Sequence, residues 1–338
     1  MTTPDAARST RTDVAGVTSA RLGAALLAAL VALVLAGCGL RPETPPPVEP
    51  SPDAVEQVRG RTVADALEIA DAATSAAAGA DVDDELRALL EQVAQVADQH
   101  AEQLGGTYDS GLPRPEVTPT SARAAVLATP ADVLGMLGEA ADEALRDADA
   151  LEDGALARLV GSVAVSRADL GARLADALEV DSPAPVPADE QTVPETVAPE
   201  SAAPLARAHD EAGFAFEVVA AHLTGKQRAA AREAAQRART LGAAWATAAG
   251  IADGPQDPRL AAYALPVGLD DDAVLDQLER TVLGGVADAY AAALAREPAG
   301  GRVAYLDGLL RAVTDARAAG AAAAAFPGLP EQAEAAAS

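Results

Sequence analysis

The residues whose types and spacing predict a definite chemistry are Leu35, Ala36, Gly37 and Cys38. They end an apolar run over residues 22–35, which follows three arginines and is too short for a membrane span of about 20 residues. A basic segment, a short apolar run and small residues before a cleavage site are typical of a signal peptide. The Leu-Ala-Gly-Cys ending matches the bacterial lipobox, in which diacylglycerol is attached to the cysteine thiol and the chain is cut before it.

We therefore expect residues 1–37 to be a lipoprotein signal peptide and the mature chain to begin at an acylated Cys38. Two acyl chains of the palmitate kind would hold it at the extracytoplasmic face of the cell membrane, because each buried CH₂ contributes about 0.8 kcal/mol. The alternatives are an ordinary signal peptide with an incidental cysteine and an uncleaved N-terminal anchor. Residues 38–51 are rich in proline, which favours an extended tether.

Metal chemistry is the next possibility, because the chain has 51 acidic residues and three histidines. A di-metal centre in a helical bundle uses Glu-x-x-His pairs, whose members share one helix face. No acidic residue here has a histidine three positions later, and the nearest pattern is Glu233-x-x-Gln236. Glutamine is a poor iron ligand compared with imidazole. We expect no metal and no cofactor other than the acyl groups on Cys38. The alternative is an atypical carboxylate site from Glu211, Glu233, Glu279 and His209.

Other functions lack their signatures. The formal net charge of −26 argues against nucleic acid as a partner, because such binding needs a basic surface. The sequence has no Gly-x-Ser-x-Gly, no phosphate-binding glycine loop and no Gly-x-Gly-x-x-Gly. Its single cysteine excludes an intramolecular disulfide and a cysteine-based zinc site. We therefore expect a protein that is not an enzyme.

The elements that must position these residues are predicted to be helices. Half of the chain is hydrophobic but only 2% is aromatic, so the cores must consist of alanine, leucine and valine, which suits close-packed helices. Apolar residues recur at three- and four-residue steps, most clearly over 82–104, where Gly105 and Gly106 mark the end. Thr129 followed by Pro130 predicts another helix start. No segment alternates with period two, so the predicted class is all-α.

Prolines and charge divide the chain. Residues 181–204 contain six prolines and five acidic residues without a basic one, which predicts an extended acidic linker. It separates a predicted four-helix bundle over 52–180 from a second helical domain over 205–332, and a disordered tail follows over 333–338. We favour two domains; the alternative is a long loop within one larger bundle.

Three segments carry a resemblance to a known family: VVAAHLTG at 218–225, AYALPV at 262–267 and AFPGLPE at 325–331. In this order and spacing they resemble a ferritin-like domain of unknown function (domain of unknown function 4439) found in high-GC bacterial lipoproteins, over roughly residues 201–332. The lipobox and the HAEQL segment at 100–104 are also similar to what such proteins carry. The resemblance implies a ferritin-like four-helix bundle and no known activity.

These observations favour a membrane-anchored, non-catalytic helical interaction module whose partner is an unknown envelope protein, because a bundle is predicted without its usual metal ligands. The alternative is a ferritin-like protein that binds a metal or a small ligand at an atypical carboxylate site. A passive spacer with weak attraction for cations is a third possibility.

Overall fold

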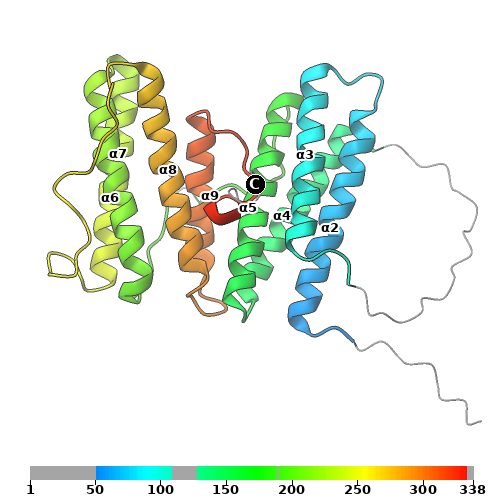
Figure 1. Ribbon diagram of the computed structural model, residues 1–338, viewed down its shortest axis with the longest axis horizontal. Coiled ribbons are helices and arrows are strands. Elements are labelled where there is room, and N and C mark those ends of the chain that lie inside the picture. The colour runs from blue at the N-terminus through cyan, green and yellow to red at the C-terminus, as the bar shows by residue number, and fades with distance from the viewer. Residues whose placement is uncertain (1–50, 109–127, 189, 333–338) are drawn as a thin grey trace, which may run out of the picture. The chain divides into compact units, whose positions relative to one another are not determined.

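The computed structural model describes residues 51–108, 128–188 and 190–332. Throughout these ranges the regular structure is helical and no strand occurs, which confirms the all-α prediction. The described helices (Figure 1) are α2 (Ala54–Ala77), α3 (Asp84–Gln103), α4 (Pro130–Ala150), α5 (Gly154–Leu178), α6 (Pro199–His222), α7 (Gly225–Ala248), α8 (Asp272–Leu294) and α9 (Val303–Ala318). The predicted signal peptide (1–37), nearly all of the predicted tether (38–51) and the predicted tail (333–338) lie outside the described residues.

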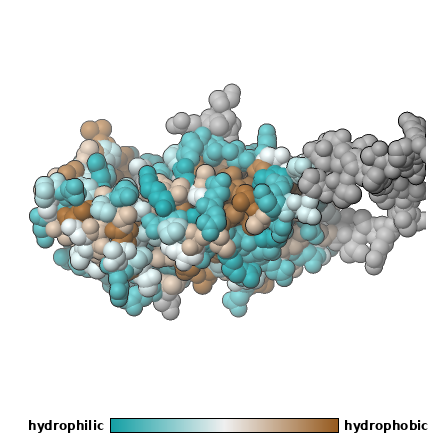
Figure 2. Space-filling model, turned by 90° about the horizontal axis from the view of Figure 1, so that it is seen from below, coloured by the Kyte–Doolittle hydropathy of each residue, from teal (hydrophilic) through white to brown (hydrophobic). Residues whose placement is uncertain are grey.

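Ser51–Ser338 form one compact unit. Hydrophilic side chains cover most of the face shown in Figure 2, and hydrophobic ones appear there in scattered spots. Among the described helices, none combines the length and the hydropathy that a membrane span requires.

Local sequence explains where several helices begin and end. Thr129 and Asp132 form a capping box at the start of α4, with Pro130 in its first turn, as predicted. Gly105 and Gly106, with φ of +87° and +67°, end α3. At four other helix starts an aspartate side chain accepts a hydrogen bond from a backbone N–H of the first turn: Asp53, Asp83, Asp153 and Asp271.

Helix α5 lies at the centre of the unit, between α4 on one side and α8 and α9 on the other (Figure 1). Every residue from 160 to 171 is buried. Polar groups within this stretch therefore need partners inside the protein. The Arg167 guanidinium donates to the backbone oxygens of Thr62 (2.8 Å) and Ala140 (3.2 Å), which ties α5 to α2 and α4.

The chain after α9 runs along α5 rather than over a bundle end. We call residues 321–331 the C-terminal strap. Its carbonyl oxygens accept hydrogen bonds from α5 and α3: Arg173 donates to Ala321 (2.7 Å), Ser166 to Ala324 (2.8 Å), Ser162 to Pro327 (2.8 Å) and His100 to Ala325 (2.7 Å). The strap therefore belongs to the interface between the N-terminal and C-terminal helices.

Arg302 makes a second connection between these helices. This buried side chain, 1% exposed, donates from Nε to the carbonyl oxygen of Leu294 (2.9 Å) at the end of α8. Its Nη1 donates to the carbonyl oxygens of Ala148 (3.1 Å) and Leu151 (2.6 Å) at the end of α4. One guanidinium thus satisfies backbone oxygens at two helix C-termini that are left without intrahelical partners.

The segment predicted as an extended linker is partly helical and partly packed. Residues 199–204 belong to the start of α6, and Pro204 lies inside that helix. Ala184 and Val197 are buried. The linker does not separate two cores, because the largest buried hydrophobic cluster includes residues of both predicted domains, such as Val160 and Tyr290. The division into two domains stays a prediction.

Helices α6 to α9 form the predicted ferritin-like bundle. α6 packs against α7 and α8, and α8 packs against α9. The α6–α7 and α8–α9 connections are short, whereas residues 249–271 run the length of the bundle from α7 to α8 (Figure 1, yellow). Two helical hairpins joined by one long crossover are the connectivity of ferritin-like bundles.

Replacing Arg302 by methionine tests the connection between α4 and α8. We expect Arg302→Met to lower the free energy of unfolding by about 3 kcal/mol or more, because several buried carbonyl oxygens lose their donor. The measurement is urea unfolding followed by circular dichroism. Arg296→Met is the control: Arg296 is exposed and donates to the carbonyl oxygen of Ala292 in the last turn of α8, so we expect a change below about 0.5 kcal/mol. Equal losses of unfolding free energy in both variants would contradict the role of Arg302 as a connection between α4 and α8.

Candidate functional site

The interior of the α6–α9 bundle contains a groove of about 1120 Å³. All four helices line it, and we call it the central groove. In the described part of the chain α7 and α9 make little or no backbone contact with each other, so the bundle is open along that side. Binding sites for small molecules in proteins have volumes of roughly 300–1,000 Å³, so the central groove is large enough for one.

The walls of the groove combine apolar and polar residues. Phe216 and Val219 of α6 and Leu283 and Val286 of α8 form an apolar stretch. Four of the nine lining residues of α7 are alanines, and α9 adds Ala312 and Ala318. Alanine at these helical positions leaves room that leucine would fill, which explains why the bundle interior is hollow rather than packed to the usual density.

Two contacts give the direction of the groove. Gly308 of α9 lies against the ring of Tyr290 on α8, and at the opposite end Arg280 of α8 donates to the carbonyl oxygen of Ala319 (3.2 Å). The groove therefore has a tyrosine end, defined by His209, Gln191 and Tyr290. The other end is near the start of α8.

At the tyrosine end, polar groups satisfy one another. The Trp245 indole N–H (3.3 Å) and the Gln191 amide both donate to the Tyr290 hydroxyl, whose own proton points to His209 Nε2 (2.8 Å). A hydroxyl has one proton and two lone pairs, so these bonds use its full capacity. His209 is therefore neutral, and burial lowers its pKa to about 4. Burial also raises the pKa of Tyr290 above its usual range. This arrangement is a fixed network rather than a poised acid–base pair.

Carboxylates gather toward the other end, which we call the acidic end: Asp272, Asp276 and Glu279 of α8 and Asp315 of α9. Burial, and then the nearby Asp276, raise the pKa of Glu279, while Arg280 opposes the shift. Burial also raises the pKa of Asp315, and Arg311 and Arg237 oppose it. Neither Glu279 nor Asp315 has an ion pair or hydrogen bond among the described side chains.

The residues of the predicted alternative metal site are not brought together. His209 and Glu279 both line the central groove, but Glu211 and Glu233 do not, and Glu233 is exposed. Gln236, the partner of Glu233 in the nearest Glu-x-x-His-like pattern, lines the groove and donates to Thr240 (3.3 Å). Within the described ranges no three His, Cys, Asp or Glu side chains are grouped so that they could hold a metal ion.

The other two histidines have different surroundings. His100 is buried against Phe326 of the C-terminal strap, with ring centroids 5.3 Å apart. Its Nε2 donates to the carbonyl oxygen of Ala325. Burial lowers its pKa to about 3, so the ring is neutral at pH 7. His100 therefore occupies a core position. His222 is exposed and lines the groove near the acidic end.

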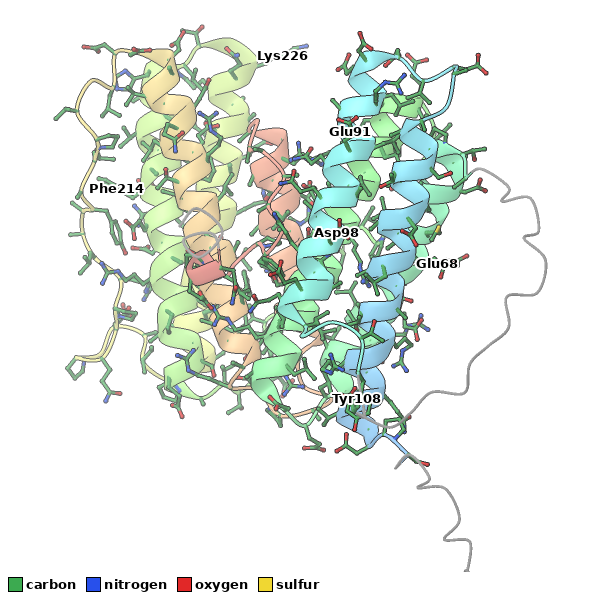
Figure 3. The ribbon with its side chains drawn as sticks, turned by 45° about the vertical axis from the view of Figure 1, so that its right-hand side comes forward. Glu68, Glu91, Asp98, Tyr108, Phe214 and Lys226 are labelled. Carbon is green, nitrogen blue, oxygen red and sulfur yellow. The ribbon has the colours of Figure 1, made fainter. Side chains whose placement is uncertain are left out.

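The aromatic residues divide between the groove and the far side of α6. Phe216 lines the groove, whereas Phe214 faces the crossover chain, where its ring centroid lies 5.9 Å from that of Tyr263 (Figure 3). Sequence reasoning did not identify Tyr290, Gln191 or Asp315 as site residues. The available signal was helical spacing: Tyr290 lies 11 residues, or about three turns, after Glu279 on α8.

Comparison with known families gives one match. Residues 201–331 match the family model described as Domain of unknown function (DUF4439). The match runs from near the start of α6 to the end of the C-terminal strap, so it includes the central groove except for Glu190 and Gln191. It confirms the resemblance found in the sequence. The comparisons with curated proteins and with solved structures gave no match.

The buried, neutral state of His209 predicts a pH-dependent stability. Its pKa is about 4 in the folded protein and near 6.5 in the unfolded chain. Between these values the unfolded state binds the proton, so stability falls as the pH falls. Between pH 7 and pH 5 we expect the wild type to lose about 2 kcal/mol more than His209→Gln, measured by urea unfolding.

The matched control is His222→Gln, because His222 is exposed. It should lose as much stability as the wild type over this pH interval. If His209→Gln also behaves like the wild type, the neutral assignment of His209 is wrong.

Proposed function

We propose that the protein is a lipid-anchored, extracytoplasmic binding protein whose central groove takes up an apolar ligand without transforming it. The observation that carries this proposal is the central groove itself, about 1120 Å³ inside a four-helix bundle, with an apolar stretch lined by Phe216, Val219, Leu283 and Val286. Cores of such bundles are normally filled by side chains. Removing apolar surface from water contributes about 25 cal/mol per Å² to the binding free energy, so an apolar ligand would be bound favourably.

Surface and site chemistry favour binding over catalysis. The hydrophobic side chains on the face shown in Figure 2 are scattered, which makes the groove the better candidate for apolar recognition. Nε2 of His209, which would be the natural general base of the groove, is already engaged by Tyr290. The carboxylates at the acidic end have no histidine or hydroxyl nucleophile bonded to them.

The lipobox sequence supports a lipid-anchored, extracytoplasmic location. Cys38 is the single cysteine of the chain and stands at the predicted cleavage site. Acylation would keep the groove close to the membrane, where apolar ligands are concentrated. An envelope protein that delivers or receives the ligand is the corresponding partner. The metal-binding alternative is less favoured, because only His209 and Glu279 of its four residues line the groove.

Filling the groove tests the binding site. Ala234 of α7 is half-buried in the wall, whereas Ala229 of the same helix is exposed and outside it. We expect Ala234→Phe to weaken binding of the neutral probe N-phenyl-1-naphthylamine at least tenfold, because the new ring occupies ligand space. Fluorescence titration of the compact unit Ser51–Ser338 measures this. Ala229→Phe should bind like the wild type; saturable binding that neither substitution changes would place the probe elsewhere.

Replacing Cys38 by serine tests the anchor. We expect metabolic labelling with an alkyne analogue of palmitate to mark the wild-type chain and not Cys38→Ser, because serine lacks the thiol that is acylated. Mass spectrometry of the mature wild-type chain should identify Cys38 as its first residue. A labelled Cys38→Ser variant, or a mature N-terminus elsewhere, would contradict the lipoprotein assignment.

A further inference from the structure

The charges of the central groove are unevenly placed, and their placement points to the class of ligand. The lining includes five carboxylates and two arginines. Three of these carboxylates, Asp272, Asp276 and Glu279, follow one face of α8, and α9 contributes Asp315. Arg311 is occupied by the backbone oxygen of Ala188. The negative charge of the groove is therefore concentrated at its acidic end.

Helix ends do not reverse this sign. The acidic end is near the N-termini of α7 and α8 and the C-termini of α6 and α9. Two positive and two negative helix ends offset each other, so the side-chain charges decide the potential. Four cationic side chains lie near this end. Two of them, Arg237 of α7 and Arg311 of α9, line the groove close to Asp315 and offset its charge. Arg280 is turned to the carbonyl oxygen of Ala319, and Lys226, near the start of α7, is exposed and does not line the groove (Figure 3).

Groove carboxylates differ from the many carboxylates of the surface. Glu68 of α2 and Glu91 and Asp98 of α3 are exposed and project away from the helices (Figure 3). Glu279 and Asp315 are instead half-buried beside apolar walls and have no ion-pair partner among the described residues. A half-buried, unpaired carboxylate is stabilised strongly by an incoming cation, because the local dielectric constant is lower than that of water.

The apolar part of the groove lies beside these carboxylates. Phe216, Leu283 and Ala312 line it between the acidic end and the tyrosine end. At the tyrosine end the network around Tyr290 already satisfies its polar groups, so a ligand there needs no hydrogen bonds. A ligand that fits both parts has a positively charged head and an aliphatic chain.

The volume of the groove, about 1120 Å³, is sufficient for a single alkyl chain with its head group. A long alkyl chain with a compact head is a ligand of the size that such sites commonly hold.

We propose that the central groove binds a single-chain cationic amphiphile, with its ammonium head at Glu279 and Asp276 of α8 and its alkyl chain against Phe216 and Leu283. This inference rests on the proposed function and specifies its ligand. The ammonium forms a charge-assisted contact with Glu279, which makes no hydrogen bond or ion pair within the described residues. The apolar walls exclude water from the chain.

The experiment uses the full chain in its own membrane. Three photoreactive probes with the same alkyl chain carry an ammonium, a hydroxyl or a sulfate head, and mass spectrometry maps the labelled peptides. We expect the ammonium probe to label α6–α9 groove peptides saturably. Glu279→Gln should reduce this labelling at least fivefold, and Asp315→Asn should reduce it in the same direction. Glu233→Gln, the same substitution at an exposed site on α7, should leave it within twofold of the wild type.

Two further comparisons separate the ligand class from the site. Groove labelling by the hydroxyl probe should not change in Glu279→Gln. In Glu279→Arg the sulfate probe should label the groove more strongly than the ammonium probe. Equal groove labelling by all three probes, unchanged in Glu279→Gln, overturns the cationic class and leaves the apolar site intact. Absence of groove labelling by any probe overturns both proposals. Labelling spread over exterior peptides also overturns the inference. In a competition experiment, displacement of the label by a basic amphipathic peptide but not by unlabelled alkylammonium overturns it as well.

Discussion

The buried guanidinium of Arg302 is the interaction on which the rest of the architecture depends. It donates to backbone oxygens at the ends of both α4 and α8, so two helices from different parts of the chain must end at the same place. Glycine permits the close approach: a side chain at Gly154 would collide with the carbonyl oxygen of Ala295, and one at Gly161 with Leu306. A buried charge without these acceptors would be strongly unfavourable, so the contact holds the two helix groups in one relative position.

The C-terminal strap fixes the same interface from the other side. Its backbone carries no regular structure over most of its length and therefore needs partners for its carbonyl oxygens. Serines and an arginine on one face of α5, together with His100 of α3, supply them. Gly328, at φ +78°, lets the strap lie directly on Ala291 of α8. The domain matched over residues 201–331 thus ends in a segment whose hydrogen-bond donors come from outside that domain.

This interface also explains why the bundle has an open groove. α9 packs against α8, α5 and α4, whereas α7 packs against α6. Because α9 is held by α5, it does not close against α7, and the alanines on both helices leave space between them. The docking of the N-terminal helices on the ferritin-like bundle therefore shapes the proposed binding site without lining it.

The sequence by itself determined the helical class, several helix boundaries and the family resemblance, because caps, glycines and apolar spacing are local signals. Of the candidate site it identified His209 and Glu279, as titratable residues on predicted helices. It could not place Tyr290, Gln191 or Asp315 beside them, since these residues come from three separate segments of the chain. Nor could spacing show that residues 181–198 and the strap pack against the helices. Those outcomes depend on which helix faces meet, and that is decided by buried contacts between residues more than 100 positions apart, such as Arg302 with Ala148 and Ser162 with Pro327.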